Sequence, residues 1–287
     1  MKLSKKHHYI PELFIKGFCG DDDKISIYYT GKNKIEKIRR SPSQILFERN
    51  RNIINKNDVL EKVYGIQESE FSKAYKKIIA SEFPTDISSF DFIQLVYFIE
   101  TLHWRVPSQD SEVKNIINEL SFKDLGLVSK NNSNTDDVFN KIKKDKGFIK
   151  IANILKSIQA YSSYDLKNNM NDWNISYLPK NKQGFNLLGD NPIILENKNS
   201  ENILNTNFRF NLSKDKAIYK SSNKYLRKLT PKDQLNLDLL TFLQAKKMVC
   251  CTNSDYLNDV VELARTYYNT EERIEILRNE VFSLNEK

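Results

Sequence analysis

The pattern of hydrophobic positions changes along the chain from a helical period to a strand period. Between residues 57 and 167, apolar side chains recur at the spacing of one helix face. Between residues 172 and 252, short apolar runs are separated by turn residues, which is typical of strands. An alternating stretch at residues 24–39 predicts a hairpin before the helices. Together these patterns predict an α+β fold: an N-terminal hairpin, a large central helical block, and then a small mixed sheet with C-terminal helices.

Capping and breaking residues set the expected ends of the elements. Residues 58–61 resemble a capping box and predict a helix that runs to about residue 83. Residues 88–91 carry a second such signal, for an apolar helix that should end near Arg105, ahead of Pro107. Further helices are expected at residues 108–120, 136–166 and 231–245 and from residue 254, with a polar loop at 130–135 and strands at 173–178, 185–188, 193–195, 207–212, 216–219 and 248–252.

This layout predicts one domain rather than two. We expect a single α+β domain over residues 1–287, with the helical layer at about 57–167 and the sheet-rich layer at about 172–252 joined by the hairpin at 24–39. Neither an internal repeat nor a linker-like segment divides the sequence. Hydrophobic residues make up 39% of the chain, with 16 Phe and 14 Tyr, which is enough apolar surface for a sizeable core.

Cysteine content and the length of the apolar runs indicate the compartment. Only three cysteines are present, too few for a disulfide framework, and Cys250 and Cys251 lie in an apolar run typical of a buried strand. No apolar run reaches the roughly 18 residues of a membrane span. The basic first six residues are not followed by the apolar segment of a signal peptide. We therefore expect a cytoplasmic protein without a membrane partner.

The chain is basic, with 45 Lys and Arg against 37 Asp and Glu and a formal net charge of +8. The densest basic stretch lies at residues 34–51. A positive surface attracts polyanions, so nucleic acid is a partner that agrees with the charge. The alternative is an ordinary solvated surface on the hairpin and the loop after it. The sequence carries no signal for an oligomeric state.

The sharpest chemical signature is the segment of residues 7–11, His-His-Tyr-Ile-Pro, in a chain with only three histidines. In an extended segment His7 and His8 point to opposite faces, so only one of them can enter a given pocket. Pro11 suits the first position of a helix, and Ile10 has no side-chain acceptor to cap it. The unpaired amides of the first turn would attract an anion and favour a neutral imidazole, which suits a general base or a metal ligand. The alternative is a histidine that only binds a buried backbone carbonyl.

Four further polar positions could contribute to a site, and each has a structural alternative. Asp190 and Asn191 precede a proline between two apolar strands, where they could set a turn or present a carboxylate. Arg105 ends the most apolar helix, where it could complement the helix dipole or bind a phosphate through two N–H groups. Glu61 could belong to the site or close the capping box. Glu68 on the same helix is expected to be a surface carboxylate.

The order of these motifs resembles the family named domain of unknown function 4238. That bacterial family is recognised by an N-terminal His-Tyr-x-Pro segment, an Arg-x-Pro after an apolar helix and an Asp-Asn-Pro turn after a strand. This chain has them at residues 8–11, 105–107 and 190–192, and the similarity covers nearly the whole chain. Where the family usually has Thr-Ser before the last motif, this chain has Leu188 and Gly189, which argues against a hydroxyl group there.

The resemblance implies architecture and candidate residues but no activity. It implies a composite polar site built from separate elements, with His8 rather than His7 facing inward. The catalytic candidates are His8, Glu61, Arg105 and Asp190. Further binding candidates are His7, Tyr9 and Asn191.

Three hypotheses about function follow. The first is a phosphodiester hydrolase, a nuclease in bacterial defence or a toxin, with His8 as general base or metal ligand and Arg105 as the phosphate-stabilising cation. The second is a non-enzymatic module that binds nucleic acid, a ligand or a protein through the same pocket. The third is a buried polar network that only ties the helices to the sheet. No nucleotide-binding loop, HExxH, GxSxG or His/Cys cluster is present, so the cofactor stays open, with a divalent metal ion as one option.

Overall fold

The computed structural model describes residues 5–81, 88–119, 135–165, 172–177, 184–198, 200, 202–221 and 230–283. Its α-helices are α1 (Glu12–Lys16), α2 (Val59–Ala80), α3 (Ser89–Arg105), α4 (Asp110–Glu119), α5 (Thr135–Lys143), α6 (Lys146–Ser163), α8 (Pro231–Gln244), α9 (Ser254–Tyr267) and α10 (Glu271–Phe282). Its strands are β1 (Lys6–His8), β2 (Ser26–Tyr29), β3 (Lys34–Ile35), β4 (Phe47–Arg49), β5 (Trp173–Tyr177), β6 (Leu188–Gly189), β7 (Ile194–Leu195), β8 (Phe208–Asn211), β9 (Lys216–Lys220) and β10 (Met248–Cys251).

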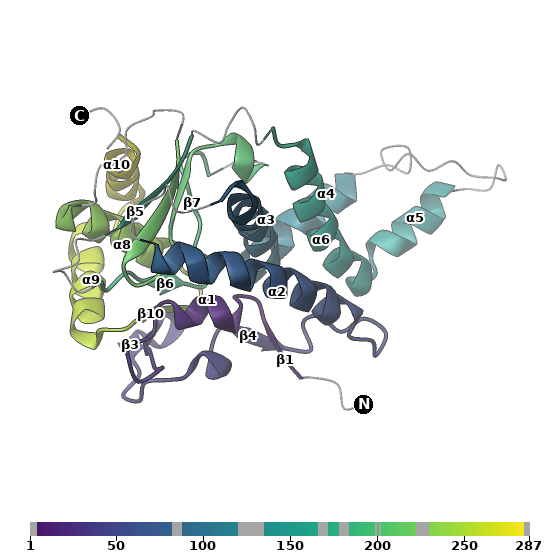
Figure 1. The fold of residues 1–287 in the computed structure, drawn as a ribbon. Coiled ribbons are helices and arrows are strands. Elements are labelled where there is room, and N and C mark those ends of the chain that lie inside the picture. The colour runs from purple at the N-terminus through teal and green to yellow at the C-terminus, as the bar shows by residue number, and fades with distance from the viewer. Residues whose placement is uncertain are drawn as a thin grey trace.

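Helices and sheets occupy different parts of the molecule (Figure 1). Helices α4, α5 and α6 lie toward one end, and the C-terminal helices α8, α9 and α10 lie with the sheets toward the other. Helix α2 crosses the middle, above the N-terminal segment that carries β1 and α1. This order confirms the predicted α+β fold, in which N-terminal strands precede a helical block and a sheet with C-terminal helices follows it.

Helix α3 begins and ends where its sequence signals predict. The Ser88 hydroxyl accepts the Asp91 amide at 3.1 Å, and the helix ends at Arg105. The helix expected over residues 136–166 is instead broken, because the Asp145 carboxylate accepts two amides of the following turn and caps α6. The expected polar loop at 130–135 lies almost entirely outside the described residues.

The capping box predicted at the start of α2 is wrong. The Val59 amide donates to the Asn57 side chain at 2.9 Å, and Asp58 makes no capping hydrogen bond. Glu61 instead accepts a hydrogen bond from the Asn52 side chain at 2.7 Å. The predicted end of this helix near residue 83 lies outside the described residues.

Every strand pairing in the described part of the chain is antiparallel, so the expected mixed sheet is wrong. The first sheet has the strand order β3-β2-β10-β6, and the second sheet has the order β5-β9-β8-β7. The predicted hairpin of β2 and β3 therefore joins a strand from near the end of the chain, with Ile27 opposite Cys250. Both side chains are fully buried, and their burial fixes this pairing. Strands β1 and β4 form a separate pair that the sequence pattern did not predict.

One hydrophobic core connects the N-terminal segment with the central helices and the second sheet. The Phe14 ring of α1 contacts the rings of Tyr75 in α2, Phe98 in α3 and Phe210 in β8. A second core fills the space between the first sheet and helices α8, α9 and α10. Within the described residues, no helix has the length and apolar character needed to cross a membrane.

Candidate functional site

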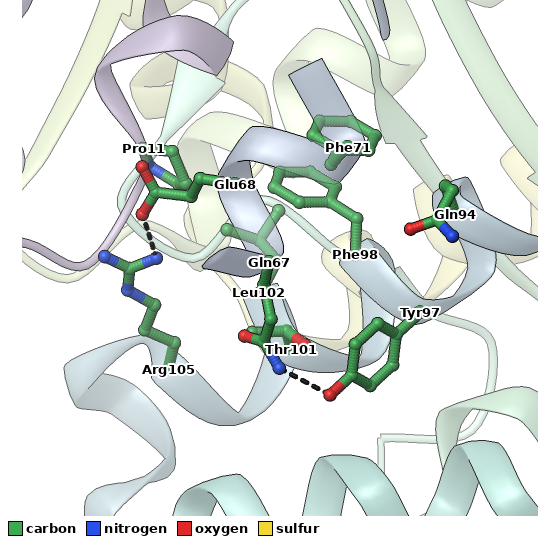
Figure 2. A pocket seen from close by; sticks show the side chains of 10 residues that line it. All are labelled: Pro11, Gln67, Glu68, Phe71, Gln94, Tyr97, Phe98, Thr101, Leu102 and Arg105. Carbon is green, nitrogen blue, oxygen red and sulfur yellow. Dashed lines mark hydrogen bonds and ion pairs between the residues drawn. The ribbon is translucent and has the colours of Figure 1, made fainter. Parts of the chain in front are cut away.

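Three elements bring a histidine, an arginine and a carboxylate together beside the start of α1. Strand β1 holds His8 opposite Phe47 of β4, the last turn of α3 supplies Arg105, and α2 supplies Glu68. Figure 2 shows the Arg105 guanidinium directed at the Glu68 carboxylate, next to Pro11. The charges of Arg105 and Glu68 both influence the pKa of His8, and we call these three side chains the His8 cluster.

His8 is held as a neutral imidazole. Its side chain is only 12% exposed, and Nδ1 lies 3.4 Å from a carboxylate oxygen of Glu12. Nε2 is buried and has no hydrogen-bond partner among the described residues. Burial lowers the pKa of His8, the Glu12 charge and a hydrogen bond to the Pro42 backbone partly offset this, and the Arg105 charge lowers the pKa further. The neutral form was predicted, but burial rather than a helix end is its main cause.

Of the three α1 amides predicted to lack an intrahelical partner, at residues 12–14, that of Phe14 is paired. Helix α1 has five residues, and Pro11 is its N-cap rather than its first helical residue. The amides of Phe14 and Ile15 donate to the Pro11 carbonyl at 3.0 and 3.1 Å. The positive charge that acts on His8 comes from the Arg105 side chain.

Arg105 is the cation of the His8 cluster, and its side chain is firmly anchored. It is 3% exposed, and its guanidinium donates to Glu68 at 2.6 Å. The guanidinium also lies over the Tyr64 ring, with its central carbon 4.2 Å from the ring centroid. Its Nε has no hydrogen-bond partner in the described structure. Glu68, expected to be a surface carboxylate, is 27% exposed, and its ion pair with Arg105 was not predicted.

A small hollow lies between Pro11, α2 and α3 (Figure 2). Its volume is about 10 Å³, room for a single water molecule. Gln67 Oε1, Thr101 Oγ1 and Arg105 Nε are buried side-chain atoms of its lining residues, without a hydrogen-bond partner among the described residues. The NH₂ group of the Gln67 side chain donates to the Tyr97 hydroxyl, as Figure 2 marks. One ordered water could satisfy this side of Arg105.

On its other side Arg105 lines a larger cavity of about 510 Å³, which we call the basic cavity. Its charged lining residues are the cations Arg49, Arg51, Arg105, Lys114 and Lys150 and the carboxylates Glu48 and Asp110. Five positive groups against two negative ones make the lining positive.

Arg51 is the second anchored cation of the basic cavity. It donates to Asp110 at 2.6 Å, to Glu48 at 2.9 Å and to the Arg105 carbonyl at 3.0 Å. These contacts hold both arginines in fixed positions next to each other. Such anchoring lowers the entropy that the side chains lose when they bind an anion.

His7 and Tyr9 lie inside the protein, and Glu61 is half-buried. His7 is fully buried, and its Nδ1 accepts the Asn52 amide at 2.8 Å. Glu61 accepts from the side chain of the same Asn52, so it braces the segment that holds His7. Tyr9 is buried, and burial together with the Asp190 charge raises the pKa of its hydroxyl.

The Asp190 carboxylate is bound by backbone amides rather than by the His8 cluster, although its charge acts on the neighbouring Tyr9. The two carboxylate oxygens of Asp190 accept the amides of Lys246 and Lys247, each at 2.8 Å, so the side chain fixes the turn before β10. Burial raises the pKa of Asp190, and these two amides partly offset the effect. Asn191 lines a second cavity, away from the residues that line the basic one.

Several residues of the site were not singled out from the sequence. Glu68 follows Glu61 by seven positions, a spacing that places both on the same face of α2. Glu12 follows His8 by only four positions in the sequence, although His8 lies in β1 and Glu12 in α1. Those spacings were the available signals. Arg51 lies in the turn after β4 and Asp110 is the first residue of α4, and only the folded chain brings them together. Among the described residues, no group of three His, Cys, Asp or Glu side chains is arranged to hold a metal ion.

Comparison with known proteins gives a family but no activity. A family model described as a protein of unknown function, DUF4238, matches residues 6–249. No curated protein and no solved structure matches the chain. The match covers the His8 cluster, the basic cavity and the Asp190 turn, and the chain therefore belongs to the DUF4238 family.

Proposed function

We propose that this protein hydrolyses phosphodiester bonds in a nucleic-acid strand that lies in the basic cavity. The observation that carries the proposal is the lining of that cavity, with five cations against two carboxylates around about 510 Å³. A lining of this charge favours phosphate groups over neutral or cationic ligands. The volume falls within the roughly 300–1,000 Å³ of small-molecule sites, so it suits a nucleotide unit of a single strand rather than a duplex.

In this proposal Arg105 and Arg51 stabilise the phosphate. Both are anchored by carboxylates, so their donors are oriented before the substrate arrives. Planar guanidinium groups can bind phosphate through two parallel N–H bonds. Lys114 and Lys150 at the same cavity would hold the flanking backbone phosphates.

His8 is the general base of the proposed reaction. Its lowered pKa leaves it neutral near pH 7, as a base must be. The Glu12 carboxylate at Nδ1 orients the ring and stabilises the imidazolium that forms, which leaves Nε2 to accept the proton of the attacking hydroxyl or water. A divalent metal ion, if the protein uses one, would bind together with the substrate phosphate.

One observation favours the second candidate function, which is binding without turnover. Nε2 of His8 is buried, so a substrate would reach it only after a local movement of the cluster. Without that movement the basic cavity would retain a strand and not cleave it. The two functions share the cavity and differ only in the role of His8.

A cleavage assay separates the two. End-labelled single-stranded RNA and DNA oligonucleotides are incubated with the protein, with and without Mg²⁺ or Mn²⁺. We expect cleavage by the wild-type protein and a loss of about 100-fold or more for His8→Ala, the usual contribution of a general base. Lys34→Gln, an exposed cation outside the cavity, should leave the rate unchanged.

Each outcome has a defined meaning. Saturable binding without any cleavage would support the binding module and reject the hydrolase. Equal cleavage by the wild-type protein and a folded His8→Ala variant would reject His8 as the base. Circular dichroism of the variants shows whether they are folded.

A further inference from the structure

A second cavity holds polar groups that the proposed function does not use. It has a volume of about 280 Å³ and lies between the end of α3, the Asn191 turn, α8 and α10. None of its lining residues lines the basic cavity. Its size is just below the roughly 300–1,000 Å³ of small-molecule sites, so it admits a small molecule rather than a peptide or a strand.

Two side chains that are more than nine-tenths buried line this cavity. His103 is 5% exposed, and burial lowers its pKa to about 3, so the ring is neutral and can both donate and accept a hydrogen bond. Arg278 is 6% exposed and donates to the Leu195 carbonyl. Its Nε has no hydrogen-bond partner among the described residues, with the nearest Glu275 oxygen at 3.6 Å. Buried polar groups in this state indicate a missing partner.

The Asp-Asn-Pro turn builds one wall of the cavity. Asp190 fixes the amide of Lys246. The Gln244 side chain donates to the carbonyls of Asn191 and Ile193, the latter at 3.2 Å. Asn191, Gln244 and Lys246 are therefore held in place around the opening, and all three line it. A wall fixed by this many hydrogen bonds is preorganised for a ligand.

The charge and chemistry of the lining select the ligand. Lys198, Lys246 and Arg278 line the cavity together with one carboxylate, Glu271. Glu275 also pairs with Lys198 and lies 3.6 Å from Arg278, so these three cations face two carboxylates and one positive charge is in excess. The carboxamides of Gln109, Asn191 and Gln244 add donors and acceptors that suit hydroxyl groups. The remaining lining residues are Ile and Leu, and no Phe, Tyr or Trp offers a stacking surface for a base.

We propose that this cavity binds a small hydroxylated organic anion. Its phosphate or carboxylate head lies at Arg278 and Lys246, and its hydroxyl groups bind His103 and the carboxamides. The carbon skeleton packs on the aliphatic floor. The inference uses none of the residues of the His8 cluster and stands apart from the proposed hydrolase.

Calorimetric titration of the full chain tests this proposal with three probes: ribose 5-phosphate, gluconate and ribose. We expect one or both anions to bind saturably at one site per chain, and ribose not to bind. Binding of ribose 5-phosphate alone assigns a phosphate head, and binding of gluconate alone assigns a carboxylate head. Absence of binding by both anions, or ribose binding as tightly as they do, overturns the proposal.

Matched variants locate the site. Ile274→Trp fills the cavity and should weaken anion binding by about tenfold or more, whereas Ile276→Trp, 53% exposed on the same helix, should not. Lys246→Gln at the opening should weaken it by about two- to fivefold, and the exposed Lys232→Gln on α8 should have no effect. If Ile274→Trp does not fold, the comparison of Lys246→Gln with Lys232→Gln locates the anion site. Equal binding by both members of these pairs would place the anion elsewhere and contradict the inference.

Discussion

At the scale of single residues, burial and hydrogen bonding separate the carboxylates that could act from those that hold the chain in place. Glu68 has a cationic partner at the edge of the basic cavity. Asp190 has both oxygens occupied by backbone amides. The sequence indicated the reverse, with Asp190 as a catalytic candidate and Glu68 as a surface carboxylate, because the partner of a carboxylate is set by elements that meet only in the folded chain.

Asp190→Asn tests the structural role of that carboxylate. Asparagine retains one acceptor oxygen but turns its NH₂ group toward a second backbone amide, so one donor loses its partner. We expect the free energy of unfolding to fall by about 1–3 kcal/mol. Cleavage per folded molecule should stay unchanged. Urea denaturation and the cleavage assay measure both, with the exposed Asp255→Asn on α9 as the control.

The opposite pattern for Asp190→Asn would contradict this assignment. Unchanged stability together with lost cleavage would return Asp190 to the catalytic group. His8 and Arg105 differ from Asp190 in this respect, because the Arg105 charge acts on the pKa of His8, whereas both oxygens of Asp190 are bound by backbone amides.

At the scale of elements, the last turn of α3 distributes three consecutive side chains to three different surroundings. His103 lines the second cavity, Trp104 packs with Val113 of α4, and Arg105 reaches Glu68 of α2. Successive residues on a helix point about 100° apart, so a single turn can serve both cavities. The position of α3 relative to α2 therefore determines where Arg105 points.

Glu68→Gln should loosen this contact. Arg105 is nearly buried, so loss of its anionic partner leaves a poorly compensated charge, although Glu68 is 27% exposed and water screens part of the effect. We expect the free energy of unfolding to fall by about 1–3 kcal/mol. Glu70→Gln, whose partner Lys73 is exposed, should change it by less than about 0.5 kcal/mol. Equal effects of the two substitutions in urea denaturation would mean that the Arg105 ion pair contributes nothing.

The elements that were predicted well are those with strong local signals. The Ser88 cap and the apolar period of α3 fix that helix without help from the rest of the chain. Strands β1 and β4 are three residues each, too short for a period to be recognised. The mixed sheet was a wrong prediction because strand order and direction depend on long-range pairings such as that of β2 with β10.

At the scale of the whole molecule, the motifs that define the family resemblance are shared between two cavities. The Arg-x-Pro segment contributes Arg105 to the basic cavity, and the Asp-Asn-Pro turn contributes Asn191 to the second one. The His-Tyr-x-Pro segment contributes His8, which lines neither of the two cavities. The sequence suggested one composite site, whereas the fold separates its members.

The pH dependence of cleavage follows from the burial of His8. Its pKa is lowered from the ordinary value of 6.5, so the neutral base forms at a pH below that value. Cleavage should therefore rise with pH through a midpoint below about 6.5 and then level off. A rate–pH profile from pH 4.5 to 9 measures the midpoint. A midpoint above 7 on the rising limb would contradict a buried His8 as the base.

The central claim, that the basic cavity holds a polyanion, is tested most directly by the salt dependence of binding. The affinity for a fluorescent single-stranded oligonucleotide is measured between 50 and 300 mM salt for the wild-type protein, Lys114→Gln and Lys34→Gln. Each lost phosphate contact should reduce the slope of log affinity against log salt by about 0.7. We predict this reduction, with weaker binding, for Lys114→Gln in the cavity and no change for Lys34→Gln outside it. The same slope for all three proteins, or no binding by the wild-type protein, would contradict the account.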